Sequence, residues 1–143
     1  MVFLLDVNVL IALIDPAHIQ HDAAHEWFGS VGKKAWASCP ITENAVLRIV
    51  GDPQYPNSPG SPADVAEVLT QLLALRGHVF WADDISLFDN PNVDTAHLLS
   101  SRQVTDSYLL ALACAHEGQL ATFDRRLVVS AVRGGSQGLC LLV

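Results

Sequence analysis

Five short apolar segments, none alternating with polar residues, most constrain the fold of this 143-residue chain. Strands that are apolar on both faces and are separated by helices are typical of a parallel sheet covered on both sides. The sequence therefore predicts an α/β fold built on a five-stranded sheet. The expected strands are residues 2–5 (VFLL), 35–39 (AWASC), 78–82 (HVFWA), 119–123 (QLATF) and 138–143 (GLCLLV).

The connecting segments carry helical patterns. Ser61 followed by Pro62 is typical of a helix start, and Gly118 of a helix end. No repeat or linker divides the chain, so we expect one domain over residues 1–143. The expected helices are residues 9–14, 21–32, 41–50, 62–75, 94–101 and 106–117.

The composition indicates a folded, soluble and cytoplasmic protein. Half of the residues are hydrophobic and only 16% are charged, which excludes a disordered chain. No apolar run reaches the roughly 18 residues of a membrane span, and the apolar start lacks the basic region of a signal peptide. The three cysteines lack metal-type spacing, so we expect reduced thiols.

Two aspartates directly follow expected strands. Asp6 comes after the first strand and Asp124 after the fourth. The carboxyl ends of parallel strands meet at one edge of the sheet, where such sheets bind ligands, so both side chains are expected there. Each also has a structural explanation, because Asp6 or Asn8 can cap the following helix and Asp124 can open a turn before Arg125.

Two further acids lie on the apolar stripes of expected helices. Asp106 precedes apolar residues by three, four and seven positions, and so does Glu43. At this spacing the side chains share the inward face of the helix. Asp106 can alternatively complement the helix dipole, and Glu43 can pair with Arg48.

Together the four acids predict a metal site. Four carboxylates at one edge would repel one another, and some would have to bind protons, unless a cation lies between them. Mg²⁺ and Mn²⁺ prefer carboxylate and water oxygens, and the chain lacks the His and Cys spacings of a zinc site. We therefore expect Mg²⁺, with Mn²⁺ as a substitute, held by Asp6, Glu43, Asp106 and Asp124.

Four motifs carry a family resemblance. In this order and at these spacings, LLDVNVLIAL, ITENAVLRIV, VTDSYLLALA and LATFDRRL resemble the PIN-domain family, and more narrowly its VapC-type ribonuclease toxins. The resemblance covers essentially the whole chain. It implies a PIN-like three-layer α/β/α fold, Mg²⁺- or Mn²⁺-dependent cleavage of RNA, a homodimer, and inhibition by a small VapB-like antitoxin.

The resemblance also implies roles for single residues. The family's four acids correspond to Asp6, Glu43, Asp106 and Asp124. Asp6 and Asp106 would ligate the main metal, and Asp124 a second one bound with substrate. Glu43 would hold a ligand water or orient the attacking water. Asn8 and Thr122 match polar family positions and would orient the carboxylates by hydrogen bonds.

The net charge of −7 argues against a broad nucleic-acid surface. Subtracting the four site acids leaves eleven Asp and Glu against eight Lys and Arg, so any basic contact surface must be local. Arg102 and Arg125, with the neighbouring Arg126, are candidates for RNA contact. Ordinary solvated arginines explain these positions equally well.

Other functions fit the sequence less well. A phosphatase acting through an aspartyl phosphate would need a DxD motif or a late lysine, whereas this chain has DVN and both lysines precede residue 35. A stand-alone RNA-processing nuclease and a non-catalytic PIN-like binding module remain alternatives. His18, His21 and His25 are expected on an exposed helix side rather than in a metal site.

Overall fold

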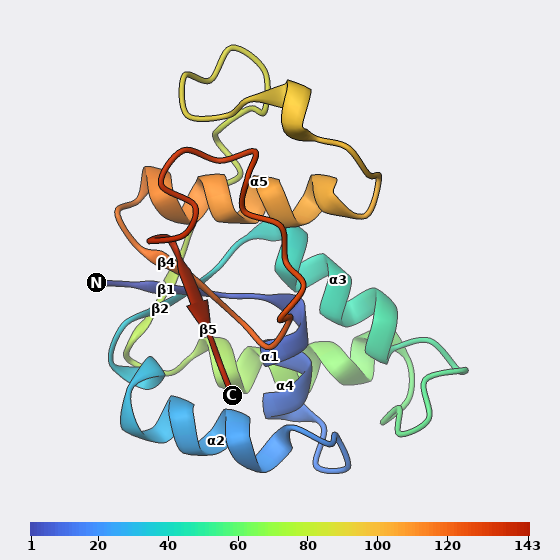
Figure 1. Ribbon diagram of the computed structural model, residues 1–143. Coiled ribbons are helices and arrows are strands. Elements are labelled where there is room, and N and C mark those ends of the chain that lie inside the picture. Colours follow the sequence, from blue (N-terminus) through green and yellow to red (C-terminus); the bar gives the residue numbers. More distant parts are fainter.

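The computed structural model describes residues 1–143 and contains one five-stranded sheet with helices around it (Figure 1). All neighbouring strands are parallel, and their order is β3-β2-β1-β4-β5, which places β1 in the centre. The predicted parallel sheet is therefore confirmed. Its strands are β1 (Phe3–Leu5), β2 (Trp36–Ser38), β3 (His78–Phe80), β4 (Gln119–Thr122) and β5 (Leu139–Leu141).

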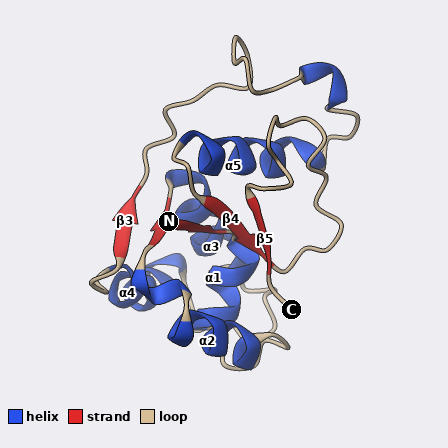
Figure 2. Ribbon diagram, turned by 60° about the vertical axis from the view of Figure 1, so that its left-hand side comes forward, coloured by secondary structure: helices blue, strands red, loops and turns tan.

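Helices cover both faces of the sheet (Figure 2). They are α1 (Val7–Ile14), α2 (His21–Ser30), α3 (Pro40–Val50), α4 (Pro62–Leu73) and α5 (Gln103–Ala115). Neighbouring residues of β1 enter two different apolar cores, because Leu5 packs with α1 to α4 and Leu4 packs with α5. This arrangement confirms the three-layer α/β/α fold.

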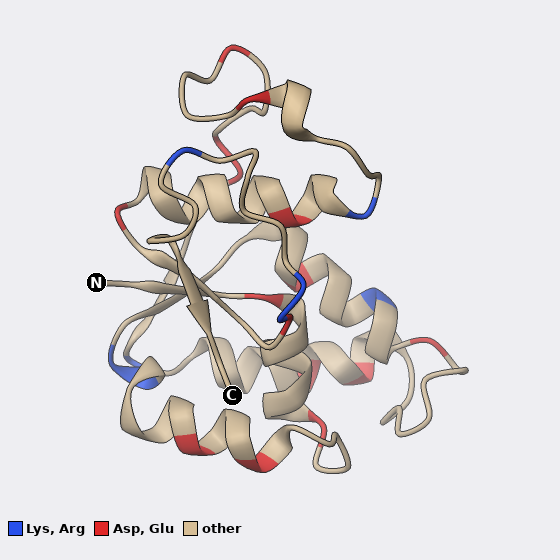
Figure 3. Ribbon diagram, viewed as in Figure 1, with Lys and Arg blue, Asp and Glu red and all other residues tan.

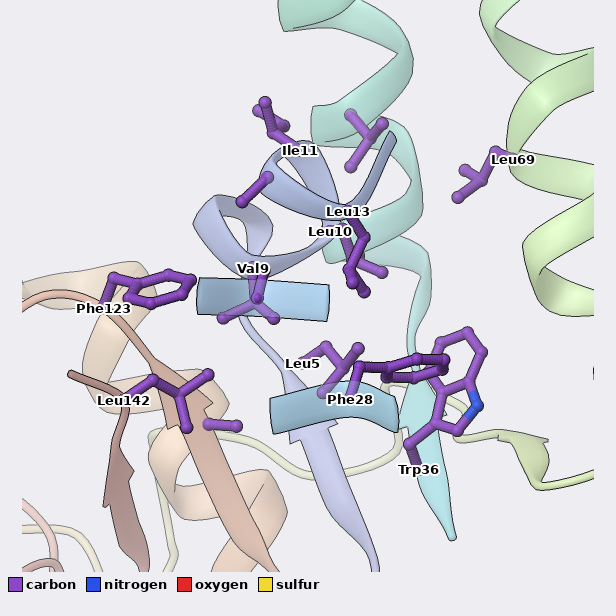
Figure 4. Packing of buried hydrophobic residues seen from close by; sticks show 14 of the residues in the cluster. Leu5, Val9, Leu10, Ile11, Leu13, Phe28, Trp36, Leu69, Phe123 and Leu142 are labelled. Carbon is purple, nitrogen blue, oxygen red and sulfur yellow. The ribbon is translucent and has the colours of Figure 1, made fainter. Parts of the chain in front are cut away.

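The helix α1 is almost wholly buried. Its residues 9–13 are all buried, and they pack with side chains such as Phe28, Trp36 and Leu69 (Figure 4). Burying each large apolar side chain contributes about 1.5–3 kcal/mol, so this core holds α1 firmly against the sheet. The residue before it, Asp6, is therefore held at the carboxyl end of β1. No helix in the structure, α1 included, is long and apolar enough to cross a bilayer.

The helices near the site differ from the prediction, and α1 begins at Val7 rather than at residue 9. α5 begins at Gln103 rather than at residue 106, so Asp106 lies within its first turn and not at its start. The helix expected over residues 94–101 is only a single 3₁₀ turn, Thr95–His97. That stretch has no buried side chain, and a short helix without a packed face is not stable in water.

Candidate active site

Asp6 is the most buried acid of the site, with a side chain only 6% exposed. It caps α1, since the Val7 N–H donates to Asp6 Oδ1 at 2.7 Å. The other carboxylate oxygen, Oδ2, accepts the Thr122 hydroxyl at 2.8 Å. Asp6 therefore caps a helix and also lies at the carboxyl edge of the sheet. The two interpretations of Asp6 are compatible.

Asn8 and Thr122 tie the segment after β4 to the first turn of α1. The Asn8 side-chain amide donates to Thr122 Oγ1 at 3.0 Å, and Asn8 Oδ1 accepts the Phe123 N–H at 3.1 Å. The Asp124 N–H donates to Thr122 Oγ1, also at 3.1 Å. One buried hydroxyl thus contacts Asp6, Asn8 and the backbone of Asp124. These hydrogen bonds hold the two acids in a defined relation.

Three carboxylates act on one another electrostatically. Burial, together with the negative charges of Asp6 and Asp124, raises the pKa of Asp106 from 3.8 to about 6. Burial also raises the pKa of Asp6; hydrogen bonds from Thr122 and Val7 lower it, and Asp124 raises it. Negative charge is therefore concentrated at this edge. No group of three or more His, Cys, Asp or Glu side chains is arranged so as to enclose a metal ion. The acids of the site therefore do not form a closed ligand cage.

Glu43 lies on the other side of β1, in the first turn of α3. Its Oε2 accepts the hydroxyl of Ser38, the last residue of β2, at 2.5 Å. The charges that raise the pKa of Asp106 come from the other two aspartates and not from Glu43. The structure therefore brings Asp6, Asp106 and Asp124 together, and it holds Glu43 by a separate contact.

An open cavity of about 460 Å³ lies over two of these acids. Asp106 and Asp124 line it together with Arg102 and Arg126. The backbone N–H of Arg126 donates to Asp124 Oδ1 at 2.9 Å, which fixes the turn after β4 that carries both residues. Figure 3 shows acidic and basic positions side by side in this region. Arg125 does not line the cavity; the remaining lining residues are Ser100, Gln103 and Val128.

Asp83 is a structural residue near the site that was not predicted from the sequence. Its carboxylate accepts the Ile41 N–H of α3 at 3.2 Å and the Tyr108 hydroxyl of α5 at 3.1 Å. It thereby links the two helices that carry Glu43 and Asp106. A signal was present, since Asp83 follows the third expected strand just as Asp6 and Asp124 follow theirs.

The clustered histidines bind the end of α1 and not the site. His21 Nδ1 lies 2.7 Å from the Ala12 carbonyl oxygen, and His25 Nε2 lies 2.8 Å from that of Leu13. The last carbonyls of a helix lack partners within the helix, and the two rings supply them. His25 is exposed and His21 half-buried, so the expected exposed helix side is only partly correct.

The chain is similar to proteins of one family over nearly its whole length. The model of the PIN domain matches residues 3–132. Ribonuclease VapC44 of Mycobacterium tuberculosis (strain ATCC 25618 / H37Rv) is 43% identical over 134 residues, which cover 94% of each chain. Ribonuclease VapC39 of the same strain is 41% identical over 134 residues, covering 94% of this chain and 96% of that protein.

A solved structure has a similar fold. The crystal structure of VapBC2 from Rickettsia felis, bound to a DNA fragment from their promoter, matches with a TM-score of 0.55 over 100% of both chains. The sequence identity is 12%, so this likeness concerns the fold alone. Together with the family match and the close relatives, it confirms the resemblance found in the four motifs. The chain belongs to the PIN-domain family and, within it, to the VapC group.

Proposed function

We propose that this chain is the toxin of a VapBC-type toxin–antitoxin pair and hydrolyses RNA phosphodiester bonds as a Mg²⁺-dependent endoribonuclease. Relatives named Ribonuclease VapC support the reaction, and the VapBC2 structure supports the pairing. The observation that carries the proposal is the cavity in which Asp106 and Asp124 lie beside Arg102 and Arg126. Carboxylates can hold a divalent cation there, and arginines can bind the phosphate that approaches it.

The donor atoms suit Mg²⁺, with Mn²⁺ as a substitute. The cavity presents carboxylate oxygens and no His or Cys. A divalent cation would offset the negative charges that, in addition to burial, raise the pKa of Asp106. We assign Asp6 and Asp106 to the main metal and Asp124 to a second one bound with RNA. When bound, the metal lowers the pKa of the attacking water and offsets charge on the phosphoryl oxygens.

The remaining residues position the reactants. Arg102 and Arg126 would bind phosphate oxygens of the RNA, because both line the cavity beside the acids. Glu43 would orient the attacking water and accept its proton. Thr122 and Asn8 would hold Asp6 and the Asp124 segment in place through their hydrogen bonds.

Two protein partners belong to the proposal. We infer a small VapB-like antitoxin that inhibits the nuclease, and a homodimer that brings the arginines of two cavities to one RNA. Co-expression tests the first partner. The small protein encoded beside this chain should relieve the growth arrest that the chain causes, and it should elute with it in gel filtration. Growth arrest that persists despite a formed complex would contradict inhibition.

The reaction is tested with purified protein and a mixed RNA substrate. Cleavage should require Mg²⁺ or Mn²⁺, stop on addition of EDTA, and be lost in Asp106→Asn. The matched control is Asp22→Asn, an exposed acid in the first turn of α2, which should cleave like the wild type. Undiminished cleavage in EDTA, or by Asp106→Asn, would refute the proposal.

A further inference from the structure

Beside β1, a short chain of hydrogen bonds runs from β3 through β2 to Glu43. Ser38, at the end of β2, is fully buried, and its hydroxyl donates to Glu43 Oε2 at 2.5 Å. The oxygen of that Ser38 hydroxyl, Oγ, also lies 2.7 Å from His78 Nε2. Glu43 and His78 are both half-buried and come from different elements, so the contact joins α3 to two strands.

We propose that Ser38 and His78 are positioning residues that hold the Glu43 carboxylate in its working orientation. This inference rests on the proposed nuclease function. The Ser38 hydroxyl occupies Oε2 of Glu43 and leaves Oε1 for the attacking water, while His78 holds the Ser38 hydroxyl. A free glutamate side chain samples several rotamers, and a short bond to a buried hydroxyl restricts it to one.

The direction of the hydrogen bonds follows from the chemistry of a hydroxyl. Ser38 has one proton, and it donates that proton to Glu43. Its contact with His78 must therefore use the ring as donor, which assigns the proton of the imidazole to Nε2. Burial lowers the pKa of His78, while the charge of Glu43 and a backbone hydrogen bond with Leu73 raise it.

The ring of His78 is itself held by the sheet. Its residue pairs with Trp36 across β2 and β3, and the two rings lie with centroids 4.5 Å apart. Trp36 is fully buried in the larger apolar core. The position of Glu43 is therefore linked to the core through Ser38, His78 and Trp36: Trp36 packs against His78, His78 contacts Ser38, and Ser38 bonds to Glu43.

A hydrolase triad is a different arrangement of the same residue types. In a triad the histidine stands between the nucleophilic serine and the acid, and the serine faces the substrate. Here Ser38 stands in the middle and has no exposed surface. Its oxygen cannot reach a substrate, so Ser38 acts through Glu43.

Kinetics of paired variants test the proposal. Ser38→Ala and His78→Phe should each lower kcat by about 10- to 100-fold, the usual effect of losing a group that orients a catalytic carboxylate. KM should hold, because the arginines that bind RNA are unchanged. His78→Gln, whose amide N–H can replace Nε2, should keep most of the activity. The matched control is His116→Phe, a ring at the other end of α5 from Asp106 that stacks on Trp81 and makes no contact with Glu43 or the Ser38 hydroxyl, so its loss should leave kcat unchanged.

The Glu43→Gln background separates positioning from general stability. If Ser38 and His78 act only through Glu43, adding Ser38→Ala or His78→Phe to Glu43→Gln should cause no further loss of kcat. Losses that multiply in the double variants, or equal losses in His78→Gln and His78→Phe, would overturn the proposal.

A measurement without RNA distinguishes this inference from the proposed function. ¹⁵N NMR of the His78 ring should show a proton on Nε2. Glu43→Gln should shift that signal when it is made in the wild-type chain, but not when it is made in the Ser38→Ala variant. An Nε2 without a proton, or a shift that persists in Ser38→Ala, would refute the hydrogen-bond chain. A wild type without ribonuclease activity but with the expected NMR signals would refute the nuclease and keep the hydrogen-bond chain.

Discussion

Around β1 and β4, burial and nearby negative charge raise the pKa values of Asp6 and Asp106, whereas beside β2 and β3 a single acid accepts a hydrogen bond from a neutral hydroxyl. The first group, here the aspartate side, comprises Asp6, Asp106 and Asp124. The second, the glutamate side, comprises Ser38, Glu43 and His78. Carboxylates that repel one another favour the binding of a cation between them. A carboxylate held by a hydrogen bond can orient a water molecule. The difference supports the roles that we propose, cation binding for the aspartate side and orientation of water for Glu43.

The largest expected effect on cleavage comes from Asp6→Asn, which removes the negative charge of Asp6 but keeps its ability to cap α1. Asparagine caps a helix as well as aspartate does, so Asp6→Asn should keep α1 intact while losing a metal ligand. We expect roughly a 1,000-fold loss of cleavage, since several kcal/mol of transition-state stabilisation depends on the ion. The measurement is kcat/KM together with thermal unfolding. A large fall in Tm would show that Asp6 is chiefly structural.

Thr122 tests how the aspartate side is held. Thr122→Val removes the buried hydroxyl that contacts Asp6, Asn8 and the Asp124 backbone. The loss should cost about 1–3 kcal/mol of unfolding free energy and reduce kcat roughly tenfold, because the partners stay buried and unpaired. Thr122→Ser keeps the hydroxyl and should retain both. Denaturant titration and steady-state kinetics measure the two quantities, and equal behaviour of Val and Ser would contradict the role of the hydroxyl.

Two neighbouring arginines test the RNA contact on the aspartate side. Arg126 lines the cavity and Arg125 does not, so Arg126→Ala should raise KM several-fold and Arg125→Ala should change it little. Losing one phosphate contact should also lower the salt dependence of binding, by a slope of about one. KM measured at several salt concentrations decides the point. Equal effects of the two substitutions would assign the contact to net charge rather than to the cavity.

The smallest expected effect is a pH dependence of stability without metal. The pKa of Asp106 is raised in the folded state to about 6 from 3.8, so the folded protein binds this proton more tightly than the unfolded chain. Stability should therefore be greatest below about pH 4 for this group and fall as the pH rises to about 6. Asp106→Asn should flatten the slope. Tm measured from pH 4 to 7 in EDTA tests this, and a rising Tm contribution from Asp106 would contradict it.

Much of the aspartate side was predictable because its signals are local. An acid directly after an apolar strand, as at Asp6 and Asp124, must lie at the carboxyl edge of a parallel sheet, and an acid on an apolar helix stripe, as at Asp106, must face inward. Glu43 was found by the same stripe. Asp83 obeys the strand rule and was overlooked, since its links to Ile41 and Tyr108 depend on helices distant in sequence.

The parallel α/β fold, the edge where the acids lie and the family could therefore be predicted from the sequence alone, because strand patterns, helix stripes and the order of motifs are visible along the chain. The division of the acids into the aspartate side and the glutamate side depends on the packing of strands that are distant in sequence. The strand order places Asp6 next to Thr122, 116 positions away, and Ser38 next to His78, 40 positions away. Burial and like-charge repulsion act through space, so the raised pKa of Asp106 and the hydroxyl that holds Glu43 exist only once the strands are packed.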